Sequence, residues 1–403
     1  MTVLAEFRRY IHQAIVVVLC CLSLLACNEA PTDLGAELIT GTDTLYAHTS
    51  GNKPMLDSLH TVSAYPVMYN SAYVLFGKTA TDEGRMFLEI IEYPDLGDTS
   101  RWSVVECALG MLPQPYIYGD TLDATLGMKG YELQKTWDTQ ITWDSVWQAD
   151  GSSSYYSTSS ATVADTTVTI AATDTLVYVN FNKDAVRRWL VVGADTARRS
   201  KELFGMVLLP TNNSSIRQYR NANQNVQVML LRVVTKNVDK ATPDTTYLKT
   251  AVASFVNTAP PQSSELVVQG ARIHSTQLTA RIDSLPPFAV VVGASFTVYV
   301  NKEQSVCGTG GIDETMELEY TDAAGSVLRF QTTLSDSSKY VFQNIAALAQ
   351  RIQKDGGRGV ITIQPATLYN TWRMNRIVLH DGLKDAAFAP RLMVVFTVPT
   401  VFK

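Results

Sequence analysis

The fold is indicated by runs such as Arg391-Leu392-Met393-Val394-Val395-Phe396-Thr397-Val398, in which β-branched, aromatic and long apolar residues dominate. Residues of these types are enriched in strands, and such a run bounded by turn formers predicts a strand. Clusters of Gly, Asp, Asn, Ser and Thr separate the runs at intervals typical of a sandwich, which predicts an all-β fold. Three further runs have the same composition: 176–181, 226–234 and 288–292.

Helical periodicity is present in two places only. The first begins after Asn182, a residue that can cap a helix, and its apolar face carries Ala185, Val186, Trp189 and Leu190. The second ends at Gly356-Gly357, where glycine adopts a left-handed conformation without strain, and is marked by Ile345, Leu348, Ala349 and Ile352. The sequence therefore predicts two short helices among many strands.

These helices reveal an internal duplication. Each follows a short strand, precedes a glycine-containing strand, and lies downstream of an apolar strand with a central alanine, Ala108 or Ala294. Lys240-Ala241-Thr242-Pro243-Asp244 interrupts the strand pattern between the copies. We therefore expect two tandem β-sandwich domains of jelly-roll type, 44–238 and 245–403, each with one short helix. The Ser/Thr-rich tract 152–175 predicts a long polar hairpin, with a flexible low-complexity loop as the alternative.

The N-terminus has the features of a bacterial lipoprotein signal. Arg8 and Arg9 form a basic head, and residues 14–26 form an apolar core that is too short to span a bilayer. The run Leu24-Leu25-Ala26-Cys27 then predicts cleavage before Cys27, diacylglycerol on its sulfur and an acyl chain on its amino group. We expect a signal peptide over 1–26 and a tether over 27–43, with an ordinary secretory signal and an incidental Cys27 as the alternative.

Bulk composition excludes some classes of partner. Without Arg8, Arg9 and Glu6 of the signal, the mature chain carries 31 basic and 37 acidic residues. This mildly acidic balance gives no reason to expect nucleic acid as a partner, because nucleic acid attracts Lys and Arg clusters. A hydrophobic content of 46% with 18% charged residues is that of a folded globular protein. We expect the partners to be the outer membrane, through the lipid on Cys27, and a glycan or another envelope protein.

The order of elements resembles the DNRLRE-type jelly-roll domains of bacterial and archaeal cell-surface proteins. Two segments carry this resemblance: the W-x(5)-W form from Trp137 to Trp143, and the terminal run that begins at Pro390. The motif that gives the family its name is missing. As a whole chain, the sequence also resembles an uncharacterised lipoprotein family of the Bacteroidetes, which implies an outer-membrane or surface lipoprotein and brings no activity with it. The matching segments are Pro31-Thr32-Asp33-Leu34-Gly35-Ala36-Glu37-Leu38, Leu75-Phe76-Gly77-Lys78-Thr79 and Tyr118-Gly119-Asp120-Thr121.

The motifs of common catalytic and metal sites are missing from the sequence. The histidines are scattered singly, and neither a Gly-x-Ser-x-Gly elbow nor a metal-ligand spacing occurs. We therefore expect a protein that is not an enzyme and needs no cofactor. Acidic residues in loops are a calcium hypothesis, with plain solvated carboxylates as the alternative: Asp120, Asp123, Asp313 and Glu314. Cys107 and Cys307 permit a disulfide in an exported protein, although a buried free thiol at Cys107 is the commoner outcome.

Trp137, Trp143 and Trp147 are the sharpest binding hypothesis, because planar indoles exposed on a β-sandwich stack on sugar rings. The alternative is that these side chains pack the core. Two functions follow. The first is a lipid-anchored surface protein with a non-catalytic binding, adhesion or scaffolding role. The second is a carbohydrate-binding module or accessory of a glycan-degrading system, which exposed tryptophans would favour.

Overall fold

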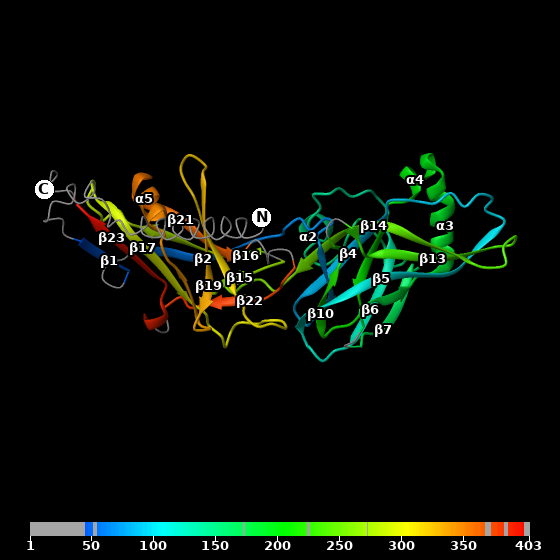
Figure 1. Cartoon of the computed structure of the whole chain (residues 1–403), viewed down its shortest axis with the longest axis horizontal. Helices are drawn as coiled ribbons and strands as arrows, with labels where there is room; N and C mark the ends of the chain where they lie inside the picture. Colours follow the sequence, from blue (N-terminus) through cyan, green and yellow to red (C-terminus); the bar gives the residue numbers. More distant parts are fainter. Residues whose placement is uncertain are drawn as a thin grey trace, which may run out of the picture.

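The computed structural model describes residues 45–50, 55–171, 174–223, 226–271, 273–366, 372–382 and 386–398. The predicted signal peptide, Cys27 and the tether lie outside these residues. The described chain is all-β, as the sequence predicts, and its strands form two large jelly-roll-like sheets and one two-stranded ribbon, β11 (Ala222–Asn223) with β12 (Val226–Gln227). The two large sheets lie at opposite ends of an elongated molecule (Figure 1).

The first large sheet has ten strands, and six of them form a ring that is closed where β14 (Asp244–Asn257) pairs with β4 (Glu83–Ile90). Along the sheet the order is β14 (Asp244–Asn257), β13 (Leu230–Asn237), β5 (Trp102–Gly119), β10 (Ser215–Arg220), β3 (Tyr73–Lys78), β4 (Glu83–Ile90), β9 (Met206–Pro210), β6 (Thr125–Glu132) and β7 (Ala164–Thr169), with β8 (Val177–Asn180) paired to β5. We call this sheet and its helices the first unit, residues 65–257.

The second sheet has eleven strands and includes both ends of the described chain. Its order is β1 (Leu45–Thr49), β23 (Arg391–Thr397), β17 (Val290–Tyr299), β20 (Lys339–Phe342), β19 (Val327–Ser335), β18 (Thr315–Thr321), β21 (Arg358–Pro365), β16 (Ile273–Arg281), β15 (Leu266–Gln269) and β22 (Arg376–Leu379), with β2 (Leu56–Ala64) paired to β16. We call it the second unit, residues 45–64 and 258–398.

Both predicted helices are present. The first is α3 (Lys183–Ala194), and the side chain of Asn182 accepts hydrogen bonds from the backbone N–H groups of Asp184 and Ala185. The second is α5 (Ala346–Lys354). The expectation of one helix per domain is wrong for the first unit, which also contains α2 (Trp143–Val146) and α4 (Thr196–Glu202). Neither has enough apolar residues at helical spacing to be recognised from sequence. A 3-10 turn covers Ala386–Phe388.

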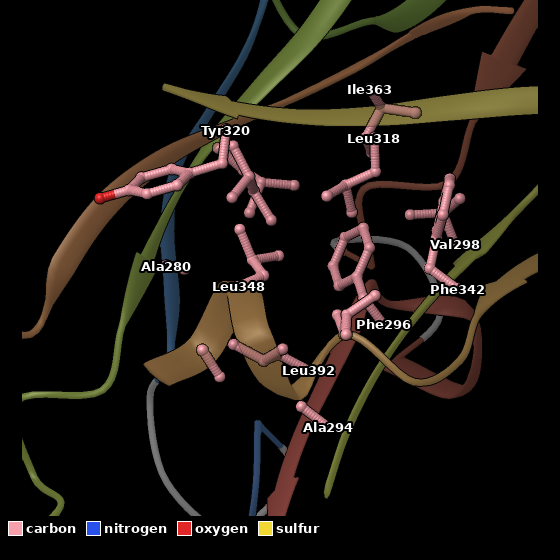
Figure 2. Close-up of a cluster of buried hydrophobic side chains, with 14 of the residues drawn as sticks. Ala280, Ala294, Phe296, Val298, Leu318, Tyr320, Phe342, Leu348, Ile363 and Leu392 are labelled. Carbon is pink, nitrogen blue, oxygen red and sulfur yellow. The ribbon is translucent and has the colours of Figure 1, made fainter. Parts of the chain in front are cut away.

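In the second unit, α5 covers one end of the core. Leu348 points from this helix toward aromatic and aliphatic side chains, among them Phe296 of β17 and Leu318 of β18 (Figure 2). Both of these side chains are fully buried. The alternation of buried and half-buried residues along β17 and β21 places the apolar side chains on this inner face, as expected of a sandwich strand.

The duplication extends to the strand pairings. In the first unit, β5 lies between β13 and β8, and β9 lies between β4 and β6. In the second unit, β17 lies between β23 and β20, and β21 lies between β16 and β18. Each helix that follows β8 or β20 leads to the equivalent strand, β9 or β21. The two units are therefore copies of one strand plan.

The predicted domain limits, 44–238 and 245–403, differ from the strand pairings. β14 directly precedes β15 of the second unit, yet it pairs with β13 and β4 of the first. β1 and β2 precede β3 of the first unit, yet they pair with β23 and β16 of the second. Residues 45–64 therefore belong to the second sheet and 244–257 to the first. The sheet to which a strand belongs is decided by its hydrogen-bonded partners and not by its position along the chain. A boundary drawn between the sequence repeats therefore assigns β1, β2 and β14 to the wrong sheet.

Candidate functional site

The three tryptophans of the predicted ligand platform, Trp137, Trp143 and Trp147, belong to a hydrophobic cluster of the first unit. Trp143 opens α2 and Trp147 follows it, with exposed fractions of 7% and 4%. Trp147 packs edge-on against Phe255, with ring centroids 5.0 Å apart, and Phe87 lies 5.7 Å away. Trp137 is half-buried, and its Nε1 donates to the carbonyl of Phe204 at 3.1 Å. The proposed ligand platform is therefore wrong, and the core alternative holds.

A cation covers the outer side of this cluster. The guanidinium of Arg85 lies 4.8 Å from the ring centre of Trp143 and 5.0 Å from that of Trp147. Glu83 holds the same guanidinium through two hydrogen bonds of 2.8 Å. A cation stacked on an indole and fixed by a carboxylate takes the place that a sugar ring would occupy on Trp143 and Trp147. The tryptophans therefore stabilise the fold.

Three of the four acidic loop residues, Asp120, Asp123 and Asp313, have side-chain partners within the protein. Burial acts to raise the pKa of Asp123, but hydrogen bonds from the Ser214 and Ser215 hydroxyls and from the Thr125 N–H outweigh it and lower the pKa to about 2. Asp120 accepts the N–H of Leu122 in a turn. Within the described ranges, no group of three or more His, Cys, Asp or Glu residues is arranged to hold a metal ion.

Both cysteines of the described chain are free thiols. Cys107 is buried on β5 and its Sγ donates to the carbonyl of Phe181 at 3.1 Å. Burial raises the pKa of Cys107 to about 11. Cys307 lies half-buried in the loop after β17, and burial likewise raises its pKa to about 11. Such thiols are protonated at neutral pH and react slowly, because the thiolate is the reactive form.

The two units meet in a packed seam with a buried polar centre. The hydroxyl of Tyr116, on β5, donates to Asn375 Oδ1 at 3.0 Å and accepts the N–H of Met374 at 2.8 Å. The amide nitrogen of Asn375 donates to Asp313 at 2.7 Å, and Arg373 lies 3.0 Å from the same carboxylate. Burial raises the pKa of Asp313 more than Arg373 lowers it. Because these groups satisfy one another out of water, the seam fixes the units in one arrangement.

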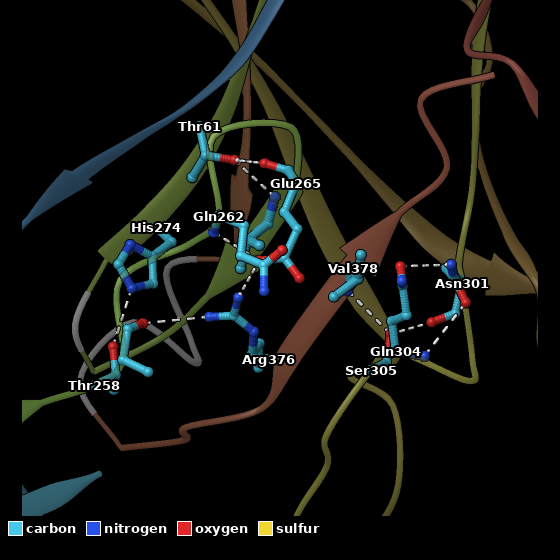
Figure 3. A network of polar contacts seen from close by, with 12 residues as sticks. Thr61, Thr258, Gln262, Glu265, His274, Asn301, Gln304, Ser305, Arg376 and Val378 are labelled. Carbon is cyan, nitrogen blue, oxygen red and sulfur yellow. Dashed lines mark hydrogen bonds and ion pairs between the residues drawn. The ribbon is translucent and has the colours of Figure 1, made fainter. Parts of the chain in front are cut away.

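A groove of about 420 Å³ opens beside this seam, and its charges are already paired. Arg376 binds Glu265 at 2.7 Å, and the same carboxylate accepts the N–H of Gln262 at 2.8 Å (Figure 3). On the facing wall, Asp82 accepts the N–H of Ala259 at 3.2 Å. The Asp82–Ala259 contact joins the two units, and the other two contacts hold residues of the second unit together, so we assign this groove a structural role.

A larger groove, of about 720 Å³, lies where two strands of the second unit diverge. β19 pairs with β18 over residues 327–333 and with β20 only at Leu334 and Ser335. β20 then pairs with β17. The side chains in the resulting opening are Thr297, Tyr299, Gln331, Thr332, Thr333, Ser335, Lys339, Val341, Gln343 and Asn344. We call this opening the β19–β20 groove.

Hydroxyl and amide groups dominate the β19–β20 groove. Thr332 donates its hydroxyl to the carbonyl of Val341 at 2.7 Å, and Gln331 donates to Glu317 at 3.0 Å. Hydroxyl and amide groups can both donate and accept hydrogen bonds, so the other lining residues match a ligand whose own groups do both. The single charged lining residue, Lys339, is paired with Asp336 at 3.2 Å. Tyr299 adds an aromatic ring, which packs edge-on against the 40% exposed Phe388 with centroids 5.5 Å apart. The groove therefore suits a neutral, hydroxyl-rich ligand better than an anion or a metal cation.

Sequence reasoning missed this groove. Alternation in residues 295–299 and 339–343 places Thr297, Tyr299 and Gln343 on the outer face of their strands. That signal identifies outward side chains, but it does not predict that β20 pairs with β17 along its whole length and with β19 only at one end. The opening depends on this divergence, which is a property of the assembled sheet.

The fold and the grooves define an all-β protein of two jelly-roll-like units. Neither a family model nor a curated protein matches the chain. Among solved structures, it is similar to the Macrobrachium rosenbergii nodavirus structure at 11% identity and a TM-score of 0.13, over 89% of this chain and 90% of that chain. It is also similar to the infectious bursal disease virus VP2 subviral particle at 10% identity and a TM-score of 0.11, over 88% and 77%. It is also similar to the T=1 Penaeus vannamei nodavirus structure at 10% identity and a TM-score of 0.10, over 80% of this chain and 97% of that chain. Scores so far below 0.5 carry no argument for this chain.

No helix within the described ranges is both long and apolar enough to cross a bilayer.

Proposed function

We propose that the protein is a lipid-anchored lipoprotein of the outer membrane that acts by contact, in binding, adhesion or scaffolding, and not by catalysis. Cys27 carries the lipid after removal of residues 1–26, and diacylglycerol together with an acyl chain gives stable attachment where one chain does not. The observation that carries the proposal is the position of β1. This strand begins at Leu45, eighteen residues after Cys27, and lies at the end of the molecule away from the first unit (Figure 1).

This position gives the molecule an orientation at the membrane. The tether enters the second unit through β1, whose Leu45 lies opposite Thr397 of β23. The residues between Cys27 and Leu45 reach at most about 60 Å when fully extended. The second unit therefore lies closer to the lipid, and the first unit is displayed farther from it. A molecule built this way presents broad β-surfaces to partners within the reach of its tether.

Fractionation tests the anchor. The variant Cys27→Ser should appear in the soluble fraction and should resist lipoprotein signal peptidase, because the acceptor sulfur is lost. Cys20→Ser is the matched control, since it changes a cysteine of the signal without touching the predicted acceptor. Membrane association of Cys27→Ser through an intact anchor would contradict the assignment.

The β19–β20 groove supports a second candidate function, the binding of a neutral glycan. Calorimetric titration of the mature protein with neutral cello-, xylo-, malto- and chito-oligosaccharides tests it, with a sulfated oligosaccharide as the anionic comparison. The double variant Thr297→Val with Gln343→Ala should weaken binding at least about tenfold, which corresponds to the loss of one or two hydrogen bonds. Thr279→Val, on the outer face of β16, is the control and should bind unchanged. Absence of binding across the panel would remove this candidate.

A further inference from the structure

The end of the second unit that lies away from the first unit carries an uncharged strand face. It is formed by β1, β23 and β17, which are hydrogen-bonded in that order (Figure 1). Leu45 and Val290 both lie opposite Thr397 in the register of these strands. Directly opposite residues project to the same face of a sheet, so these three side chains form one row. Tyr46 points to the other face, where its ring stacks on that of Phe396.

The apolar side chains at this end are open to solvent. Leu45 is 66% exposed and Val290 is 46% exposed, on either side of Thr397. Val292 is 51% exposed and lies where the register between β17 and β23 shifts. Phe288, in the loop before β17, is 56% exposed. We call Leu45, Phe288, Val290 and Val292 the apolar end face.

The segments that build this face contain no charge. Neither Asp, Glu, Lys nor Arg occurs within residues 45–49, 284–301 or 392–398. Asp283, which precedes the loop, is paired with Arg281 at 3.7 Å and with Arg358 at 3.1 Å. Single exposed apolar residues are common, but a cluster without charges marks a surface that meets another apolar surface.

The place of this face along the chain indicates what it meets. Leu45 belongs to the face, and it is also the residue at which the predicted tether enters β1, eighteen residues after Cys27. A lipid on Cys27 therefore holds this end of the molecule near the bilayer, and not the first unit. Such a link raises the effective concentration of the bilayer at the face, so that a weak apolar contact is populated.

We propose that the apolar end face rests on the lipid bilayer, with its four side chains at the boundary between headgroups and acyl chains. The setting rests on the proposed lipid anchor, but the side chains make the contact themselves, so a chain without lipid retains it. Apolar area drives this binding, and a face without charge gains little from anionic lipid. The contact seats the second unit on the membrane, and the first unit then projects away from it.

Vesicle binding tests the contact. The mature chain, residues 27–403 with Cys27→Ser, carries no lipid and is floated on a density gradient with phosphatidylcholine vesicles. We expect a bound fraction that rises with lipid concentration and changes little with salt or with added phosphatidylglycerol. Val290→Asp with Val292→Asp should weaken binding at least about tenfold, because two valines no longer remove apolar area from water. Absence of binding by the parent chain would overturn the proposal.

A matched pair in the first unit serves as the control. Leu122 and Val238 are 89% and 73% exposed, so Leu122→Asp with Val238→Asp removes at least as much exposed apolar surface and should bind unchanged. Equal loss in the two aspartate pairs would also overturn the proposal. Val290→Thr with Val292→Thr keeps the branched shape that strands favour and should weaken binding less, in the same direction. This second variant keeps the test decisive if the aspartates disturb β17.

Two further measurements separate the alternatives. Sedimentation of the parent chain without vesicles should show no dimer that Val290→Asp with Val292→Asp dissociates. Such a dimer without vesicle binding would assign the face to a second copy of the chain and contradict the proposal. The anchor is tested apart, because four side chains alone bind reversibly and leave washed membranes. Loss of membrane fractionation in Cys27→Ser therefore reports on the anchor, whereas vesicle binding of the chain without lipid reports on the face.

Discussion

At the scale of single residues, the aromatic cluster around Phe87 makes Trp147 a stabilising side chain. Trp147→Ala should lower the free energy of unfolding by about 3–5 kcal/mol, because it removes a buried indole and leaves a cavity. Trp137→Ala is the comparison and should cost less, since that side chain is half-buried. Urea denaturation measures both. A Trp147→Ala protein of unchanged stability would contradict the core assignment.

Asp123 should make the free energy of unfolding depend measurably on pH in the acid range. Its folded pKa of about 2 lies below its value of about 3.9 in the unfolded chain. A depressed pKa stabilises the fold above the unfolded value, and this stabilisation is lost as the pH falls from about 4 toward 2. Asp123→Asn removes the titrating group, so its unfolding free energy should fall less over this range than that of the wild type. Parallel pH curves for the two proteins would contradict the assignment.

At the scale of elements, the cap of α3 is a discrete stabilising feature. Asn182→Ala removes the acceptor for two backbone N–H groups and should cost about 1 kcal/mol. Asn182→Asp keeps an acceptor oxygen and is the matched control, expected to remain within a few tenths of a kcal/mol. Thermal unfolding followed by circular dichroism compares them. An equal loss in both variants would show that the cap does not contribute.

Elements were predictable where side-chain pattern alone defines them. Val186, Trp189 and Leu190 at helical spacing identify α3, and the β-branched run 391–398 identifies β23. The hairpin expected within 152–175 is wrong, because β7 pairs with β6 at residues 125–130 and not within that tract. A polar strand has no apolar alternation to reveal its partner. α4 was missed for a related reason, since it has no buried residue.

At the scale of the whole molecule, the seam makes the two units unfold together. Tyr116→Phe removes a hydroxyl that serves Met374 and Asn375 in a buried site, which should cost about 1–3 kcal/mol. It should also broaden or split the calorimetric transition, because coupling between the units weakens. Tyr247→Phe, at a tyrosine that is 55% exposed, is the control. A single transition of unchanged width and midpoint in Tyr116→Phe would contradict this role.

The overall architecture was only partly accessible from the sequence. The all-β class and the order of repeated elements follow from local patterns around Asn182 and Ile345. β1 and β2 pair within the second unit and β14 pairs within the first, although each is next to the other unit in the sequence. These pairings join residues more than a hundred positions apart, such as Leu45 and Thr397. The β19–β20 groove depends likewise on the pairing of two strands that are not consecutive in the sequence, β20 and β17. Neither local propensity nor periodicity contains that information.

The attachment of β1 also determines how the molecule bears mechanical load. If lipid on Cys27 holds one end while a partner pulls on the first unit, the force passes through β1 and its ladder with β23. Hydrogen bonds of an antiparallel ladder lie perpendicular to the strands. A pull along β1 therefore shears the register pairs from Leu45 to Thr49 all at once, whereas a sideways pull would peel them apart in succession. The ladder between β1 and β23 should therefore resist a pull along β1 more strongly than a sideways pull.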